Sequence, residues 1–285
     1  MIKKIVCASF GTENSEDIIN YIISAGKKFN SEIILLYVKP KPYFEGLENI
    51  PGDSGRLYTD WIGETTEKEI KRLKKIVCNV ADNDLKCRIE VRQGVLHEEI
   101  LDFSSEENAD LISFSKEKTI GHYSPLPRTV LKLIRQSHIP VITVNGSKKF
   151  DVKNIVVPTS LYDLNSDDLK YALEISEYLK SKIYHLNVLE NPEYNMPVEL
   201  VSRYRGDAYS KIAQMNLDRK NVEPCVIESQ SVYSGISEFV ENKKIDLIIM
   251  NTYRGEKGRK KEFIGSIAES VIQTAKCPVI TIRPL

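Results

Sequence analysis

The chain has 285 residues, of which 41% are apolar and 28% are charged, a composition that can form two modest domains with a core each. Forty basic and 40 acidic residues cancel to zero net charge, which excludes the overall positive field of a general nucleic-acid-binding protein. The five cysteines are not closely spaced, which indicates reduced thiols in a cytoplasmic protein rather than a disulfide framework. No apolar run approaches about 18 residues, so we expect neither a signal peptide nor a membrane span.

Strand and helix patterns alternate along the first half. Short apolar runs rich in β-branched residues predict strands, and apolar residues at helical spacing predict helices. A Pro- and Gly-rich excursion at 40–55 interrupts the alternation and is either a variable surface loop or a lid. In chain order we expect strands at 5–9, 33–38, 87–92, 111–114 and 140–144, and helices beginning at Asn14 or Ser15 and at 65–81, 96–106 and 129–136.

The second half follows the same order. We expect strands at 155–158, 183–189, 222–228, 245–250 and 279–282, and helices at 166–180, 197–218, 235–242 and 266–275. Continuous apolar strands that alternate with helices predict an α/β fold with a doubly wound, mostly parallel sheet in each half. In such sheets ligands bind beyond the carboxyl ends of the strands, where the winding reverses.

The two halves repeat each other. Lys4–Ser9 resembles Asn154–Thr159, 110–112 resembles 246–248, and 139–144 resembles 277–282, in the same order in each half. The polar stretch at 145–149 is typical of a short linker. We therefore expect one domain at 1–147 and a second at 148–285, each with a five-stranded sheet.

The loop after the fourth strand of the second copy combines glycines with basic residues. Gly255 and Gly258 permit positive φ, and Gly265 and Ser266 stand at the start of a helix. Free N–H groups and the helix dipole at such a start attract anions. The basic residues of the loop are Arg254, Lys257, Arg259, Lys260 and Lys261. On these features alone, a polyphosphate cradle and a solvated loop with an ordinary helix cap fit equally well.

These residues give the chain a resemblance to the universal stress protein family, one copy in each half. The tandem five-strand copies, their apolar endings and the Gly-rich segment carry the resemblance. Family members that bind ATP have the pattern Gly-x2-Gly-x9-Gly-Ser/Thr, and Gly255 with Gly265-Ser266 matches its second half. Thr252 stands where the pattern has its first glycine. The resemblance implies a fold of the adenine nucleotide alpha hydrolase type, with the two copies as a pseudo-dimer in one chain.

The resemblance further implies that the second copy binds ATP or a related nucleotide, with or without Mg²⁺. The family's aspartate after the first strand is replaced by Phe10 in the first copy and Ser160 in the second, which affects nucleoside recognition more than phosphate binding. The nucleotide-binding residues implied are Val157, Pro158 and Thr159 beside the base, and Gly255, Gly265 and Ser266 at the phosphates. Gly258 would give the loop freedom, Arg254 or Lys257 would supply charge, and Asn251 completes the implied set.

The first copy departs further from the family pattern. Pro127 and Arg128 replace the Gly-Ser pair, and proline has no N–H to offer a phosphate. We expect this copy to bind no nucleotide and to pair with the second through the last strands, 141–144 beside 279–282, which would cover two sheet edges. Further pairing of two chains into a homodimer stays open, and we expect neither nucleic acid nor membrane as a partner.

We interpret the chain as a cytoplasmic stress-response protein that binds or regulates and is not an enzyme. One alternative is an interaction platform that binds no nucleotide, because the family's aspartate is missing from both copies. A second is a slow ATPase, although no carboxylate is placed to orient a water molecule. The four histidines are dispersed, so no metal site is expected. Tyr58, Trp61, Tyr204 and Tyr209 fit packing or a partner face better than a base-stacking platform.

Overall fold

The computed structural model describes most of the chain. The described residues are 2–9, 15–40, 53–81, 85–115, 128–144, 149–160, 167–191, 194–215, 221–252 and 264–283. In the first copy the elements are β1 (Lys4–Ser9), α1 (Ser15–Phe29), β2 (Glu32–Pro40), α2 (Asp53–Ala81), β3 (Cys87–Gly94), α3 (Leu96–Glu106), β4 (Leu111–Ser115), α4 (Arg128–Gln136) and β5 (Val141–Val144). In the second copy they are β6 (Asn154–Thr159), α5 (Asp167–Leu179), β7 (Lys182–Glu190), α6 (Val198–Met215), β8 (Val222–Ser229), α7 (Val232–Asn242), β9 (Leu247–Asn251), α8 (Ser266–Thr274) and β10 (Val279–Ile282).

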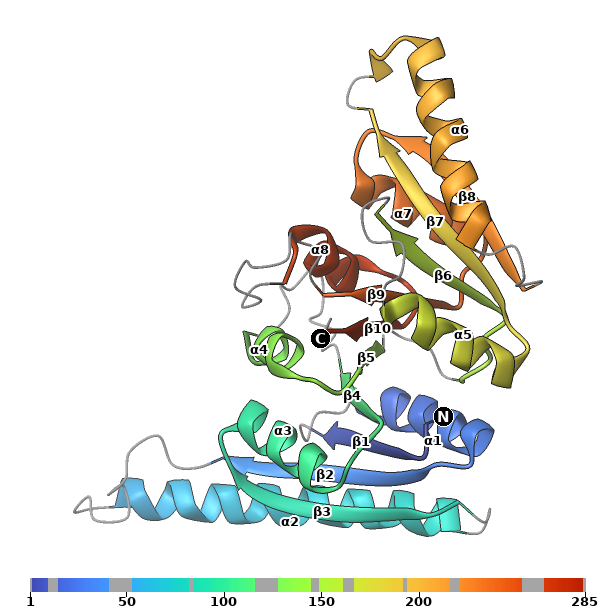
Figure 1. Cartoon of the computed structure of the whole chain (residues 1–285). Coiled ribbons are helices and arrows are strands. Elements are labelled where there is room, and N and C mark those ends of the chain that lie inside the picture. The colour runs from blue at the N-terminus through green and yellow to red at the C-terminus, as the bar shows by residue number, and fades with distance from the viewer. Residues whose placement is uncertain are drawn as a thin grey trace.

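The strands form one ten-stranded sheet that consists of two equivalent halves (Figure 1). Its order is β3-β2-β1-β4-β5-β10-β9-β6-β7-β8, so each copy contributes five parallel strands in the same relative order. The halves meet where β5 pairs with β10 in antiparallel orientation. The predicted α/β class and the two doubly wound five-stranded halves are confirmed.

The inner strands of each half are apolar and buried on both faces, whereas the edge strands β3 and β8 carry charged residues and are only partly buried. Alternate residues of β9 show the division: Leu247 and Ile249 lie on the face that α5 covers, whereas Ile248 and Met250 lie on the face of α7 and α8. In the first copy, α1 and α2 lie on one face and α3 and α4 on the other. No helix among the described residues is long and apolar enough to cross a membrane.

The internal repeat extends to individual hydrogen bonds. Asp110 accepts the N–H of Lys4 at 2.9 Å, and its counterpart Asp246 accepts the N–H of Asn154 at 2.9 Å. Ser31 donates to the Ile2 carbonyl at 2.7 Å, and Ser181 donates to the Val152 carbonyl at 2.6 Å. Left-handed residues also recur, with Asn30 and Lys180 (φ 54° and 57°) at the ends of α1 and α5. These matches establish residue-by-residue equivalence between the copies.

The seam between the copies is dry and hydrogen-bonded on both sides. Thr143 Oγ1 donates to the Val279 carbonyl at 3.3 Å, and the equivalent Thr281 Oγ1 donates to the Val141 carbonyl at 3.2 Å. All four residues are buried. The linker adds Phe150, whose ring lies 5.4 Å from the ring of Tyr21 in α1. The expected contact between the two last strands is therefore present in the structure.

One predicted helix boundary was wrong. We expected a helix at 65–81 after an excursion that reached residue 55, but α2 begins at Asp53 and spans 29 residues. Gly55 and Gly63 lie inside the helix, where each glycine costs about 1 kcal/mol relative to alanine. Contacts of α2 with β2 and β3 compensate for that cost. The predicted lid at 40–55 falls mostly on residues 41–52, which lie outside the described residues.

Candidate functional site

The point where the winding reverses in the second copy lies between β6 and β9. These neighbouring strands lead into helices on opposite faces, since α5 follows β6 and α8 follows β9 (Figure 1). Parallel sheets bind ligands at such points, beyond the carboxyl ends of the strands. The described residues here come from the carboxyl ends of β6 and β9 and from the starts of α5 and α8.

The end of β6 brings together the three residues expected beside a base. Val157, Pro158 and Thr159 are consecutive and buried at the carboxyl end of the strand. The carbonyl oxygen of Thr159 accepts a hydrogen bond of 3.0 Å from Nδ2 of Asn187 in the neighbouring strand β7. Asn187 is itself buried, so this contact fixes the last peptide of β6.

Asn251 ends β9 and carries an unsatisfied side chain. It is 3% exposed, yet neither Oδ1 nor Nδ2 has a hydrogen-bond partner within the described part of the chain. A buried amide without a partner costs about 1–3 kcal/mol for each unsatisfied group. Asn251 follows Ile249 by two residues and so lies on the face of the sheet that α5 covers. The side chain is thus a polar group at the predicted site that a ligand or water can satisfy.

Asp168 is a site residue that the sequence analysis missed. Its carboxylate is fully buried in the first turn of α5, where Oδ1 accepts the N–H of Leu169 at 2.9 Å. Oδ2 accepts the N–H of Asn251 at 3.2 Å, which ties the end of β9 to the start of α5. Although the family's carboxylate after the first strand is missing, Asp168 supplies another carboxylate at the end of β9.

The start of α8 has no side-chain cap. Gly265 is the N-cap residue and has no side chain to accept the first-turn N–H groups, and no such bond to another side chain is found within the described ranges. The Gly265 N–H itself donates to the Thr252 carbonyl at 2.8 Å, while the Thr252 N–H donates to the Ile282 carbonyl at 2.8 Å. The first helical hydrogen bond is donated by Glu269, so the N–H groups of Ser266, Ile267 and Ala268 precede it. These three amides, rather than that of Gly265, are the donors that α8 can offer an anion.

The loop that carries the basic residues of the predicted site lies outside the described residues. Arg254, Gly255, Lys257 and Gly258 all lie outside the described residues. Their assignment to the phosphates stays a prediction. The structure does bring together the ends of β6 and β9 and the start of α8, which hold the other six predicted residues.

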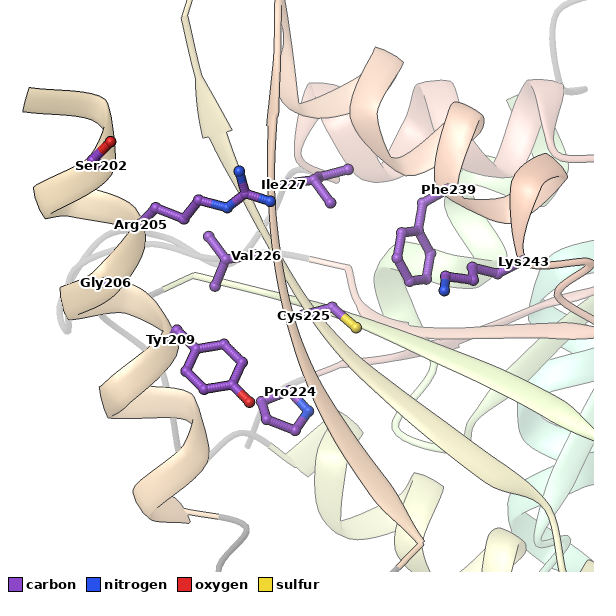
Figure 2. A pocket seen from close by; sticks show the side chains of 10 residues that line it. All are labelled: Ser202, Arg205, Gly206, Tyr209, Pro224, Cys225, Val226, Ile227, Phe239 and Lys243. Atoms are coloured by element: carbon purple, nitrogen blue, oxygen red, sulfur yellow. The ribbon is translucent and has the colours of Figure 1, made fainter. Parts of the chain in front are cut away.

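A groove of about 570 Å³ lies elsewhere, along the outer edge strand β8. Figure 2 shows Arg205 and Tyr209 of α6 on one side of β8, with Phe239 of α7 and its C-cap residue Lys243 on the other. None of the predicted site residues lines it. Tyr209 is half exposed beside this groove and Tyr204 is half exposed on the same helix, so their interpretation as packing residues or a partner face stays a prediction.

Four of the five thiols are poorly suited to nucleophilic chemistry. Burial raises the pKa of Cys7 to about 11 and that of Cys277 to about 12. Burial also raises the pKa of Cys87 and of Cys225 to about 11. At neutral pH these four side chains are protonated and unreactive. The described residues contain no cluster of three or more His, Cys, Asp or Glu side chains that could hold a metal ion.

The sequence model of the Universal stress protein family matches the chain twice, at residues 1–145 and 151–283. The chain belongs to the universal stress protein family. One curated relative, Universal stress protein MJ0531 of Methanocaldococcus jannaschii, is 30% identical over 149 residues, which are 49% of this chain and 85% of the relative. The tandem arrangement therefore consists of two copies of one family domain.

Solved structures agree with the fold of this universal stress protein. A universal stress protein from Archaeoglobus fulgidus is 17% identical and has a TM-score of 0.73, with 98% of each chain covered. A functionally unknown protein from Pseudomonas aeruginosa, PA1789, is 14% identical and has a TM-score of 0.66, with 99% of this chain and 93% of that chain covered. Both similarities extend over both copies and their relative arrangement.

In the described part of the first copy, this universal stress protein has no counterpart of the contact between Asp168 and Asn251. Ile18 stands at the position of Asp168 and is buried among apolar residues, and Ser115 stands at the position of Asn251. Helix α4 begins at Arg128, the counterpart of Ser266, and Pro127 lies outside the described residues. That the first copy binds no nucleotide stays a prediction, for which these replacements supply a physical reason.

Proposed function

We propose that the chain is a regulatory binding protein rather than an enzyme, and that its second copy holds ATP or a related nucleotide, alone or with Mg²⁺, where β6 and β9 end. One observation carries the proposal: the uncapped start of α8 lies beside the buried, unsatisfied Asn251 at the point where the winding reverses. Helix starts of this kind supply N–H groups and a favourable dipole to phosphate.

Each residue has a separate task in this proposal. The N–H groups of Ser266, Ile267 and Ala268 and the Ser266 hydroxyl donate to the phosphates, and Arg254 and Lys257 add positive charge. Val157, Pro158 and Thr159 border the base, while Asn251 offers a donor and two lone pairs to the nucleoside. Asp168 positions Asn251 through its backbone N–H and does not touch the ligand.

Calorimetric titration of the full chain with ATP tests the proposal, together with the variants Gly265→Asp and Gly265→Ala. Aspartate is a good N-cap, so its carboxylate would occupy the free amides of α8 without loss of the fold and would repel phosphate. We expect ATP to bind the parent chain and to bind Gly265→Asp at least about tenfold more weakly. Gly265→Ala is the matched control, because a Cβ there would lie 3.7 Å from its nearest neighbour, the Thr252 carbonyl oxygen.

No saturable binding of ATP by the parent chain would defeat the proposal. Equal affinity of the parent and Gly265→Asp would move the site away from α8. Release of phosphate from ATP that continues unchanged in Gly265→Asp would be assigned to a contaminant, not to this chain.

A second candidate is an interaction platform without a nucleotide. It is favoured by the backbone amides of Asn251, Thr252 and Gly265, which are already bound to Asp168, Ile282 and Thr252. The loss of the family aspartate at Phe10 and Ser160 points the same way. Mass spectrometry of the protein purified without added nucleotide separates the two candidates, since a bound nucleotide would co-purify only in the first case.

A further inference from the structure

Two equivalent clefts border the seam, on the face covered by α1 and α5. The approximate twofold axis that relates β5 to β10 produces each feature of the seam twice. Burial raises the pKa of the Tyr171 phenol, to which Asp110 of the first copy contributes. Burial likewise raises the pKa of the Tyr21 phenol, to which Cys277 and Asp246 of the second copy contribute. Each copy's helix thus faces the start of the other copy's strands.

One of the two clefts is filled by the linker. Phe150 is 3% exposed, and its ring lies 5.4 Å from the rings of both Tyr21 and Phe29, edge-on to each. The backbone N–H of Phe150 donates to Ser24 Oγ of α1 at 3.1 Å. The aromatic ring and the N–H of Phe150 therefore bind the helix surface together. Because the linker joins the copies once, it can fill only one of the clefts.

The other cleft, which we name the seam cleft, is open and has a volume of about 320 Å³. That volume falls in the range of small-molecule sites, roughly 300–1,000 Å³. Its apolar walls include Ile2 and the rings of Phe29 and Tyr178, which stack at 5.3 Å. Its polar groups include the carboxylates of Asp110 and Glu174 and the Tyr171 hydroxyl, which has no hydrogen-bond partner within the described ranges.

The filled cleft indicates which chemistry the seam cleft accepts. Tyr21 and Ser24 of α1 correspond to Tyr171 and Glu174 of α5. Where Ser24 accepts the N–H of Phe150, the seam cleft therefore presents a carboxylate. In the seam cleft, a ligand could place its ring and its nitrogen in the way that Phe150 does in the filled cleft. The ligand's ring would then contact Tyr171, and its nitrogen would contact Glu174. A carboxylate favours a protonated amine over a neutral amide at that position.

We propose that the seam cleft binds an arylethylammonium ion, a molecule in which two carbons separate an aromatic ring from a protonated amine. The atoms N, Cα, Cβ and ring of Phe150 have the same connectivity, so the linker supplies the geometry of such a ligand in the equivalent cleft. The stacked rings of Phe29 and Tyr178 would form one wall beside the ligand ring, and Glu174 and Asp110 would pair with the ammonium group. None of the residues proposed to hold the nucleotide lines the seam cleft, and this proposal does not depend on nucleotide binding.

Titration of the full chain with 2-phenylethylamine at pH 8 tests this proposal by calorimetry and by NMR of the aromatic side chains. A ligand of this size is expected to bind with a Kd of about 1 mM. The resonances of Phe29, Tyr171 and Tyr178 should shift with saturation. The same ring and chain length with a negative head group, 3-phenylpropionate, should show no saturable shift, because two carboxylates line the cleft.

Two variants of α5 localise the effect. Glu174→Gln should weaken 2-phenylethylamine binding about five- to tenfold, since it replaces a charge-assisted hydrogen bond with a neutral one. Glu177→Gln is the matched control, an exposed glutamate of the same helix that does not line the cleft. Both substitutions are at exposed positions, so the fold should persist. The proposal is overturned if 2-phenylethylamine does not saturate, if 3-phenylpropionate binds equally well, or if the two variants behave alike.

Discussion

A buried carboxylate, Asp168, organises the end of β9. It is fully buried, and it accepts hydrogen bonds from the N–H groups of Leu169 and Asn251. A buried charge is tolerated only where such donors surround it. The helix dipole at the start of α5 adds a favourable field for a negative charge. Asp168 therefore belongs to the local structure on which the predicted site depends.

Asp168→Ala should destabilise the chain by about 1.5–3 kcal/mol, because the N–H of buried Asn251 loses a charged acceptor. Urea unfolding followed by circular dichroism measures this loss. Asp167→Ala is the control: Asp167 pairs with Lys170 at 3.2 Å on the surface, where such pairs contribute up to about 1 kcal/mol. A loss in Asp168→Ala no larger than that in Asp167→Ala would show that the buried contact contributes nothing.

The sequence could not have predicted the role of Asp168. In the sequence, Asp167 and Asp168 are two acidic residues in the first turn of a predicted helix. The helix dipole explains such a pattern without any further contact. Only the register of the sheet brings α5 beside the end of β9, more than 80 residues away. Asn251, by contrast, was identified from its place after the fourth strand, because that position follows from strand order. Its lack of a side-chain partner required the structure.

At the scale of elements, strand positions were more predictable than helix lengths. Buried parallel strands are marked by continuous apolar runs, so β10 was predicted with the bounds that the structure gives. Helix α2 was predicted 12 residues too short at its start, because glycine and proline before residue 56 indicated a loop. Its actual length is supported by contacts with β2 and β3, which a local sequence pattern does not reveal.

Helix α7 is held close to the sheet by a glycine. A Cβ atom at Gly235 would lie 2.6 Å from Val188 Cγ1 and 3.0 Å from Ser229 Cβ, so no side chain fits without a shift of α7 away from β7 and β8. Gly235→Ala should therefore lower the free energy of unfolding by about 1–3 kcal/mol, as overpacked core substitutions do. Urea unfolding provides the measurement.

The matched control for α7 lies on α6. A Cβ at Gly206 would meet nothing within 4 Å, so Gly206→Ala should raise the free energy of unfolding by about 0.5–1 kcal/mol through helix propensity alone. If the free energy of unfolding falls in Gly235→Ala and rises in Gly206→Ala, the effect of packing is separated from that of helix propensity. If Gly235→Ala were also stabilising, the close approach of α7 to Val188 would be wrong.

At the scale of the whole molecule, the chain joins two copies that would otherwise expose an apolar edge strand each. β5 and β10 have four residues each, all buried, and they pair only with β4 and β9 once the copies are separated. An exposed edge of this kind invites pairing with another chain. The two Thr side chains that bond across the seam give the edge a self-complementary pattern, since Thr143 and Thr281 are equivalent.

Expression of residues 148–285 alone should therefore yield a homodimer in which two β10 strands pair in antiparallel orientation. Light scattering coupled to gel filtration should give twice the mass of the fragment. Ile280→Lys should convert the fragment to a monomer, because Ile280 is 2% exposed at the seam and its replacement by lysine would bring two charges together across the axis.

In the dimer of the parent fragment, each Phe150 would face the Tyr171 and Glu174 of the other fragment, as it faces Tyr21 and Ser24 in the full chain. Both clefts would then be filled by linker residues, so the dimer should not bind 2-phenylethylamine. A monomeric parent fragment would instead mean that the seam forms only because the linker holds the two copies together.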